Sequence, residues 1–269
     1  MPDVSIASGS SLLPGPGGAG PSDAEAWFDS ALGRFVLERE HAYFDNAVSD
    51  VFGFNALQLG LPDHDFLRSS RMPLRIAVSP GQGGDLVADF HDLPIASNSV
   101  DLIVAPHLLE FSSDPHQVLR ELVRMLMPEG HLVLCGFNPR SLWGLRRLAA
   151  RGAGGFPWTG RFIHLPRLKD WLALLSCEIT GGRMGCYSPP FAQDKWRRRF
   201  GFMEAAGDRW WPFGGGVYFV EAVKRVRGMR LITAKWSDSR ARRRRFVVVP
   251  QRVARSDEAP AIRPQGDGA

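Results

Sequence analysis

Short apolar runs alternate with longer segments of helical periodicity through the central part of the chain. The apolar runs predict strands at 56–60, 74–78, 85–89, 100–105, 131–135, 178–179 and 217–223. Apolar positions three and four residues apart predict helices at 23–41, 114–126, 141–151 and 166–176. This alternation is typical of βαβ units and therefore predicts an α/β fold built on a mostly parallel sheet.

The fourth strand and the helix after it have the clearest boundaries. Val100–Ala105 is almost continuously apolar, as expected for a central strand that is buried on both faces. Ser113 or Asp114 is placed to cap the following helix, and Pro115 occupies its first position, where a missing N–H costs nothing. The turn Met127–Gly130 ends the helix, and another buried strand follows.

Length and composition favour one domain with a tail at each end. A chain of 269 residues with 44% hydrophobic content can bury one sizeable core. Residues 1–22 are rich in Gly, Pro and Ser and are expected to be disordered. Residues 23–228 form the expected domain, with the first helix as an N-terminal cover, and residues 229–269 form a basic, flexible tail.

The formal charge of +5 is distributed unevenly along the chain. Residues 224–245 contain ten Lys or Arg and one acid, whereas residues 1–223 carry a net charge of −4. Arg240–Arg245 is a candidate for contacts with nucleic-acid phosphates, but a solvated tail explains it too and no recognition motif accompanies it. The basic tail therefore gives no firm evidence for a nucleic-acid partner.

Two further features indicate a soluble cytoplasmic protein. No run approaches the roughly 20 apolar residues of a membrane helix, and no signal peptide is evident at the N-terminus. Cys135, Cys177 and Cys186 are odd in number and lack metal-binding or redox spacing, so we expect reduced core residues. No metal site is predicted.

The segment from residue 88 to residue 135 carries a family resemblance. Asp89 ends the third expected strand and Phe90 follows it. The turn Leu93–Ile95, the fourth strand, the helix, the turn at 127–130 and the fifth strand come next. This order resembles the class I S-adenosylmethionine-dependent methyltransferases. More narrowly, Gly136–Pro139 and the helix after it are similar to a proteobacterial methyltransferase family, over about residues 44–227.

The resemblance implies a Rossmann-like methyltransferase sheet, mostly parallel with an antiparallel last strand, and helices on both faces. It also implies S-adenosylmethionine as the cofactor, bound at the carboxyl ends of the strands. Asp89 would accept a hydrogen bond from the adenine amino group, and the backbone N–H of Phe90 would meet a ring nitrogen. Gly60 and Pro106, which end the first and fourth strands, complete the implied cofactor site. The alternative for Asp89 is that it only caps a turn.

Two departures from the family pattern put cofactor affinity in doubt. A Gly-x-Gly-x-Gly loop normally follows the first strand, but here Gly60 precedes Leu61–Asp63. Ser79–Pro80 stands where an acid normally holds the ribose hydroxyls. We therefore expect weak binding, or binding that uses Asp63 or Asp65 in an altered way.

The acceptor side of the site has few candidates. His107, just beyond the fourth strand, is the best-placed general base, with Glu110 one helical turn further along the chain. A satisfied structural histidine is the alternative. An aromatic group between the last two strands is a candidate either for an acceptor pocket or for ordinary core packing: Trp196, Phe200, Trp210, Trp211 and Phe213.

The favoured hypothesis is an enzyme that transfers a methyl group to a small or lipid-like acceptor. The alternative is a catalytically silent binding or regulatory module with the same fold. A nicotinamide-dependent dehydrogenase is disfavoured because no Gly-x-Gly-x-x-Gly motif follows the first strand.

Overall fold

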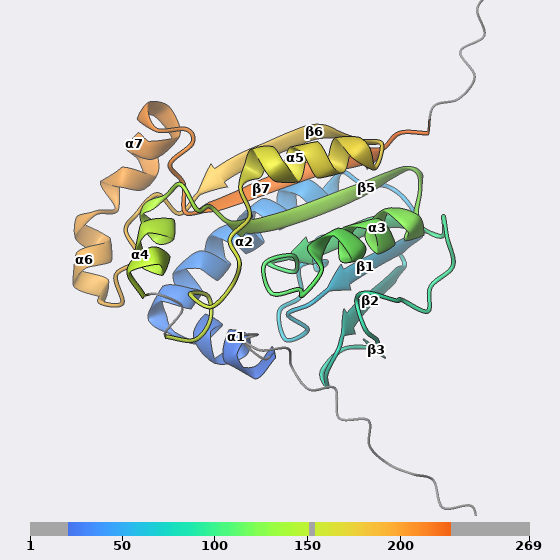
Figure 1. Cartoon of the computed structure of the whole chain (residues 1–269), viewed down its shortest axis with the longest axis horizontal. Helices are drawn as coiled ribbons and strands as arrows, with labels where there is room; N and C mark the ends of the chain where they lie inside the picture. Colours follow the sequence, from blue (N-terminus) through green and yellow to red (C-terminus); the bar gives the residue numbers. More distant parts are fainter. Residues whose placement is uncertain (1–20, 151–153, 227–269) are drawn as a thin grey trace, which may run out of the picture. The chain divides into compact units, whose positions relative to one another are not determined.

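A seven-stranded sheet forms the centre of the computed structural model, which describes residues 21–150 and 154–226 (Figure 1). The strand order is β3-β2-β1-β4-β5-β7-β6. Strands β1 to β5 pair in parallel, and β7 is antiparallel to both of its neighbours. The strand bounds are β1 (Asn55–Leu59), β2 (Leu74–Ser79), β3 (Leu86–Val87), β4 (Val100–Pro106), β5 (Leu126–Phe137), β6 (Cys177–Gly185) and β7 (Val217–Lys224). The predicted fold class is confirmed.

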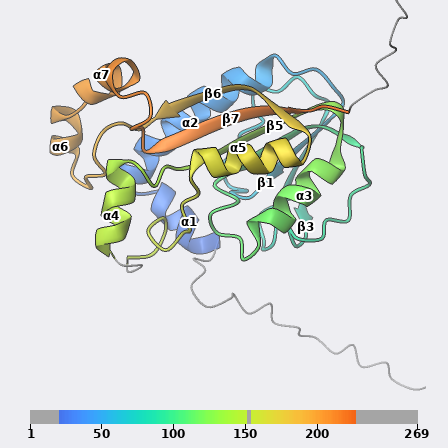
Figure 2. The same ribbon diagram turned by 45° about the horizontal axis from the view of Figure 1, so that its top comes forward.

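Helices cover both faces of this sheet (Figures 1 and 2). One buried cluster joins the sheet to α3 and α5, and a second joins its other face to α1 and α2. The helix bounds are α1 (Pro21–Phe28), α2 (Ala31–Ser49), α3 (Pro115–Met125), α4 (Leu142–Ala150), α5 (Leu165–Leu174), α6 (Asp194–Arg199) and α7 (Phe202–Trp210). No helix in the described ranges is long and apolar enough to cross a bilayer.

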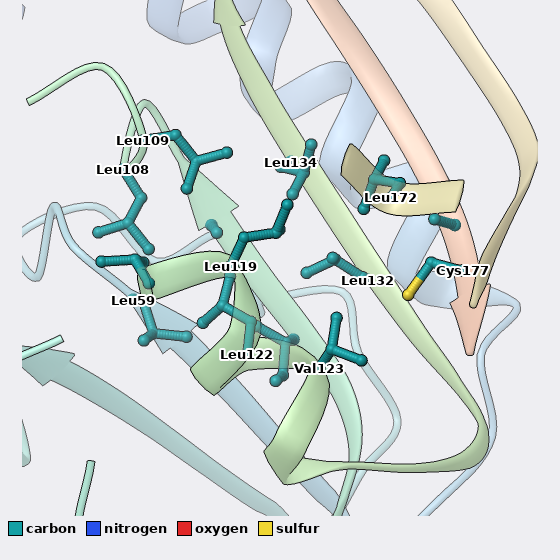
Figure 3. Close-up of a cluster of buried hydrophobic side chains, with 14 of the residues drawn as sticks. Leu59, Leu108, Leu109, Leu119, Leu122, Val123, Leu132, Leu134, Leu172 and Cys177 are labelled. Atoms are coloured by element: carbon teal, nitrogen blue, oxygen red, sulfur yellow. The ribbon is translucent and has the colours of Figure 1, made fainter. Parts of the chain in front are cut away.

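The α3 face shows how the sequence pattern becomes a core. Leu119 and Leu122 of α3 point toward Leu132 and Leu134 of β5 (Figure 3), and all four side chains are buried. Burial of each such side chain stabilises the fold by about 1.5–3 kcal/mol. The predicted start of α3 is also confirmed, because Asp114 Oδ1 accepts the N–H groups of the second and third helical residues at 3.0 Å.

The N-terminal cover differs from the single helix predicted for residues 23–41. It consists of α1 and α2, which are separated at Asp29 and Ser30. Ser30 caps α2, since its Oγ accepts the N–H of Gly33 at 3.0 Å. Gly33 also allows the helices to approach closely, because a Cβ atom there would lie 2.1 Å from the carbonyl oxygen of Trp27.

The connections in the first half of the sheet contain no helix among the described residues. The chain passes from β1 to β2, from β2 to β3 and from β3 to β4 through turns and irregular segments. One face of the sheet at β1 and β4 is therefore covered by α1 and α2 rather than by helices from these connections. The predicted turn at 127–130 lies inside β5, where Glu129 has a φ of +63° and the register with β4 shifts.

Residues 1–20 and 227–269 lie outside the described part of the chain. They include nearly all of the predicted N-terminal tail and the whole basic tail with Arg240–Arg245. The three cysteines, by contrast, lie in the described part of the chain, and all of them are free and buried.

Candidate cofactor-binding and active site

The carboxyl ends of β1, β2 and β3 meet at one edge of the sheet. The ladders continue past the strand ends, since the N–H of Gly60 donates to Val78 O at 3.0 Å and the N–H of Ala88 donates to Ser79 O at 3.1 Å. Gly60, Ser79 and Asp89 are therefore brought to the same edge, as the parallel topology requires. This is where open α/β sheets bind ligands.

Asp89 is exposed and is held by a neighbour in its own turn. Its Oδ1 atom accepts the backbone N–H of His91 at 2.9 Å and lies 2.7 Å from His91 Nδ1. His91 Nε2 lies 3.1 Å from Ser112 Oγ and 3.2 Å from Ser113 Oγ. The backbone N–H of His91, followed by its side chain, lowers the pKa of Asp89, so the carboxylate is charged at neutral pH.

Both contacts of the Asp89 carboxylate with His91 are made by Oδ1. No residue in the described part of the chain donates a hydrogen bond to Asp89 Oδ2. Phe90 is half-buried and packs against the cluster that includes α3, so its position beside Asp89 is fixed. Pro106 is buried as the last residue of β4 and pairs with Cys135.

The loop after β1 is tied down by one buried glutamine. Gln58 Nε2 donates to the carbonyl oxygens of Leu61 and His64 at 3.0 and 2.7 Å, and Gln58 Oε1 accepts the N–H of Phe66 at 2.9 Å. Gly60 has a φ of +85°, which glycine adopts without strain. The carbonyl groups of Leu61 and His64 thus turn toward Gln58. In the described structure no helix begins directly after β1, so no helix N-terminus would face a ligand there.

The loops after β1 and β2 touch each other. A Cβ atom on Gly83 would lie 3.3 Å from Pro62 Cγ and 3.6 Å from Asp63 Oδ1. Ser79 is buried, and its Oγ accepts the N–H of Gly81 at 3.3 Å. Asp65 caps its own turn through the N–H of Leu67 at 2.9 Å. Of the two acids considered for altered binding, Asp63 is therefore the one beside the β2 loop.

His107 lies between two carboxylates in a fully buried cluster. Its Nε2 is 2.6 Å from Glu40 Oε1, and its Nδ1 is 2.7 Å from Glu110 Oε2. Glu110 Oε1 accepts the backbone N–H of Phe137. The side chains come from α2, from the segment after β4 and from the end of β5. His107 is only 3% exposed, so solvent does not reach it directly.

The protonation of this cluster follows from its neighbours. Burial opposes the charged imidazole, but the carboxylates of Glu40 and Glu110 outweigh burial and raise the pKa of His107 well above its usual value. Burial raises the pKa of the Cys135 thiol to about 11. The raised pKa of His107 favours an imidazolium between the two acids, although burial also raises the pKa of Glu110.

The same cluster contains metal-ligating side chains. Donor atoms of Glu40, His107 and Cys135 lie within 4.8 Å of one another. Because Nε2 of His107 already pairs with Glu40 at hydrogen-bond distance, an ion pair accounts for two of these three groups. Glu40 Oε2, however, is buried and has no hydrogen-bond partner.

The sequence analysis missed Glu40, Gln58 and His91. A signal for Glu40 does exist, because it stands in the four-residue spacing of the buried stripe of α2: Leu32, Val36, Glu40, Phe44 and Val48. An acid inside an apolar stripe predicts a buried partner. His91 and Gln58 carry no comparable signal.

The predicted aromatic group is mostly at the surface. Trp210, Trp211 and Phe213 are 77%, 71% and 78% exposed, and Phe200 is half-buried. Trp196 lines an open groove beside α4. These residues do not form part of the buried core.

Comparison with known proteins bears on the fold and on the family resemblance. Residues 70–134 match the model of a methyltransferase domain. A solved S-adenosylmethionine-dependent methyltransferase from Thermotoga maritima superposes with a TM-score of 0.54 at 15% identity, over 76% of this chain and 96% of that one. The resemblance to class I methyltransferases is confirmed, and S-adenosylmethionine is the cofactor that it implies.

The relatives that are similar in sequence include YafS and a malonyl-[acyl-carrier protein] O-methyltransferase. YafS of Escherichia coli is 32% identical over 157 residues, which cover 58% of this chain and 65% of YafS. A malonyl-[acyl-carrier protein] O-methyltransferase of Hahella chejuensis is 30% identical over 95 residues, which cover 35% of this chain and 33% of that protein. The chain thus spans less than two thirds of each of these relatives.

Proposed function

We propose that this chain, with its class I methyltransferase fold, binds S-adenosylmethionine at the carboxyl edge of the sheet and transfers its methyl group to a small or lipid-like acceptor. The observation that carries the proposal is the position of Asp89. It stands at the end of β3, inside the segment that matches the methyltransferase domain, with one carboxylate oxygen fixed by His91 and the other available to a ligand.

The residues at the edge suit the adenosyl part of the cofactor. Asp89 Oδ2 would accept the adenine amino group, the backbone N–H of Phe90 would donate to the ring, and the Phe90 side chain would lie along it. Gly60 and Pro106 would line the same site at the ends of β1 and β4. When bound, the cofactor would supply a methyl group on a positively charged sulfur.

In this proposal His107 would receive a proton from the acceptor only after its imidazolium has passed a proton to Glu40 or Glu110, which leaves a neutral ring with a free nitrogen. Its burial beneath α1 and α2 means that an acceptor reaches it only when this cover opens. The name of one relative, malonyl-[acyl-carrier protein] O-methyltransferase, agrees with an acyl acceptor whose oxygen is methylated.

One specific observation favours the catalytically silent alternative. Gln58 turns two carbonyl groups of the loop after β1 inward, where a glycine-rich loop would offer backbone N–H groups to the cofactor. In a silent module the adenosyl end of a ligand would still bind at Asp89, but no methyl transfer would follow.

Isothermal titration with S-adenosylmethionine and S-adenosylhomocysteine tests the proposal. We expect wild-type protein to bind both, and Asp89→Ala to weaken binding about 10- to 100-fold, because a hydrogen bond to a charged group contributes about 1.5–3 kcal/mol. Asp92→Ala is the matched control, since Asp92 is an exposed acid of the same loop. Equal binding by the two variants, or no binding by wild type, rejects the proposal.

A second measurement separates enzyme from silent module. Purified protein is incubated with methyl-labelled cofactor and a panel of small carboxylic acids, fatty acids and phospholipids. Label transfer that is lost in Asp89→Ala supports the enzyme. Cofactor binding without transfer to any acceptor, together with unchanged binding in His107→Gln, supports the module.

A further inference from the structure

Large apolar side chains are exposed in one region of the molecule. Nine of the sixteen exposed large hydrophobic residues in the described part of the chain belong to α4, α6, α7 and the segments beside them. We call this set the α4–α7 surface: Leu142, Leu145, Leu148, Phe191, Trp196, Phe202, Trp210, Trp211 and Phe213. Figures 1 and 2 both place α4, α6 and α7 together at one end of the sheet. Large exposed apolar side chains gathered in one region of a monomer often mark an interaction site.

The surface also contains a groove. It has a volume of about 620 Å³ and runs between α4 and the segment from Pro189 to Trp196. Its lining is apolar except for Arg146 and Gln193. The Arg146 guanidinium lies 4.5 Å from the ring centroid of Trp158 and donates to the carbonyl of Pro190, so it is held at the groove.

Basic residues are concentrated in the same segments. Residues 138–151 contain four arginines and no acid, and residues 191–213 contain five Lys or Arg and three acids. Together they hold nine of the 20 basic residues of residues 1–223, but only three of the 24 acidic ones. The exposed cations in the described part of these segments are Arg140, Arg146, Lys195, Arg199 and Arg209.

We infer that the α4–α7 surface docks on the interface of an anionic phospholipid bilayer. Tryptophan and phenylalanine favour the boundary between headgroups and acyl chains, and leucines enter the chains. Arginine and lysine beside them attract anionic headgroups. A second copy of the chain fits less well, because a two-fold contact would bring the same basic surfaces together. This inference does not rest on the proposed function, since it involves neither the cofactor nor the strand edge.

The test is co-sedimentation of the full chain with vesicles of phosphatidylcholine, with and without phosphatidylglycerol. We expect binding only to the anionic vesicles. The double variant Trp210→Ser/Trp211→Ser should bind about tenfold or more weakly, because two large aromatic side chains no longer enter the interface. Phe52→Ser/Phe54→Ser is the matched control, since these side chains are 76% and 73% exposed but lie between α2 and β1.

The basic C-terminal segment is present in every variant, so its own attraction to anionic vesicles cancels in the comparison. Equal binding by wild type and the tryptophan variant overturns the inference, as does equal binding to neutral and anionic vesicles. Quenching of tryptophan fluorescence by brominated lipid in wild type, and its reduction in the variant, supports insertion. A change in oligomeric state or in binding to a single-stranded oligonucleotide, without a change in vesicle binding, assigns the surface to another partner. The melting temperature of each variant is measured as well. Only variants that melt at the wild-type temperature are compared, so that weaker binding is not caused by loss of the fold.

Discussion

Glu40 Oε1 lies 2.6 Å from His107 Nε2, and both side chains are almost completely buried. The contact joins α2 to the segment after β4, across 67 residues of sequence. It anchors the N-terminal cover to the residue that we propose as the acceptor-side base. The cover and the candidate active site are therefore coupled through one ion pair.

We predict that Glu40→Ala lowers the free energy of unfolding by about 3–5 kcal/mol, because it leaves a buried imidazolium with one carboxylate removed. Urea denaturation measures this change. Glu38→Ala is the control, since Glu38 is exposed on the same helix and should change stability by less than about 0.5 kcal/mol. Similar midpoints for the two variants would show that the buried pair contributes little.

A second prediction concerns pH. The pKa of His107 is raised in the folded chain, so the stabilisation is fully present below its ordinary value of about 6.5 and is lost as the pH rises through the raised pKa. Above about pH 6.5 we expect the unfolding free energy of wild type to fall relative to that of His107→Gln, by up to about 1.4 kcal/mol per pH unit. Denaturation at a series of pH values measures the difference. Parallel curves for the two proteins would contradict an imidazolium at this site.

Local sequence signals were sufficient for most of the sheet and for α3. Val100–Pro106 is apolar except for Asp101, and Asp114 and Pro115 mark a helix start on their own, so the neighbouring elements did not need to be known. The break between α1 and α2 was missed because the apolar stripe continues across Ser30. Two contacts decide the break: the N–H of Gly33 donates to Ser30 Oγ, and Gly33 packs closely against Trp27. The first contact is local in sequence, whereas the second depends on how the two helices pack.

The candidate site was predictable where it depends on strand order alone. The carboxyl ends of parallel strands must meet, so Gly60 and Asp89 could be assigned to one edge. The cluster at His107 depends on how α2 crosses the sheet, and this is not set by any local pattern. The partner of Asp89 was missed for a different reason, because a histidine two residues away has many possible orientations.

Gln58 provides a third prediction. Gln58→Leu leaves the N–H of Phe66 and two loop carbonyls without their partner, so we expect a loss of about 1–3 kcal/mol in stability. Hydrogen exchange of the Phe66 amide should become faster, because the loop opens more often. Gln82→Leu, at an exposed position in the β2 loop, should leave this exchange unchanged. Slow exchange in Gln58→Leu would mean that packing alone holds the loop.

The last prediction tests whether His91 positions Asp89 for the cofactor, and it rests on the proposed function. His91→Ala removes the side-chain contact at 2.7 Å but leaves the backbone N–H that Asp89 also accepts. We therefore expect binding of S-adenosylhomocysteine to weaken about two- to tenfold, which is less than for Asp89→Ala, because one hydrogen bond contributes about 0.5–1.5 kcal/mol. His91→Asn retains a side-chain donor and should recover part of the affinity, while His164→Ala, at an exposed position, should have no effect. If His91→Ala binds like wild type while Asp89→Ala does not bind, the carboxylate is positioned by its backbone turn alone.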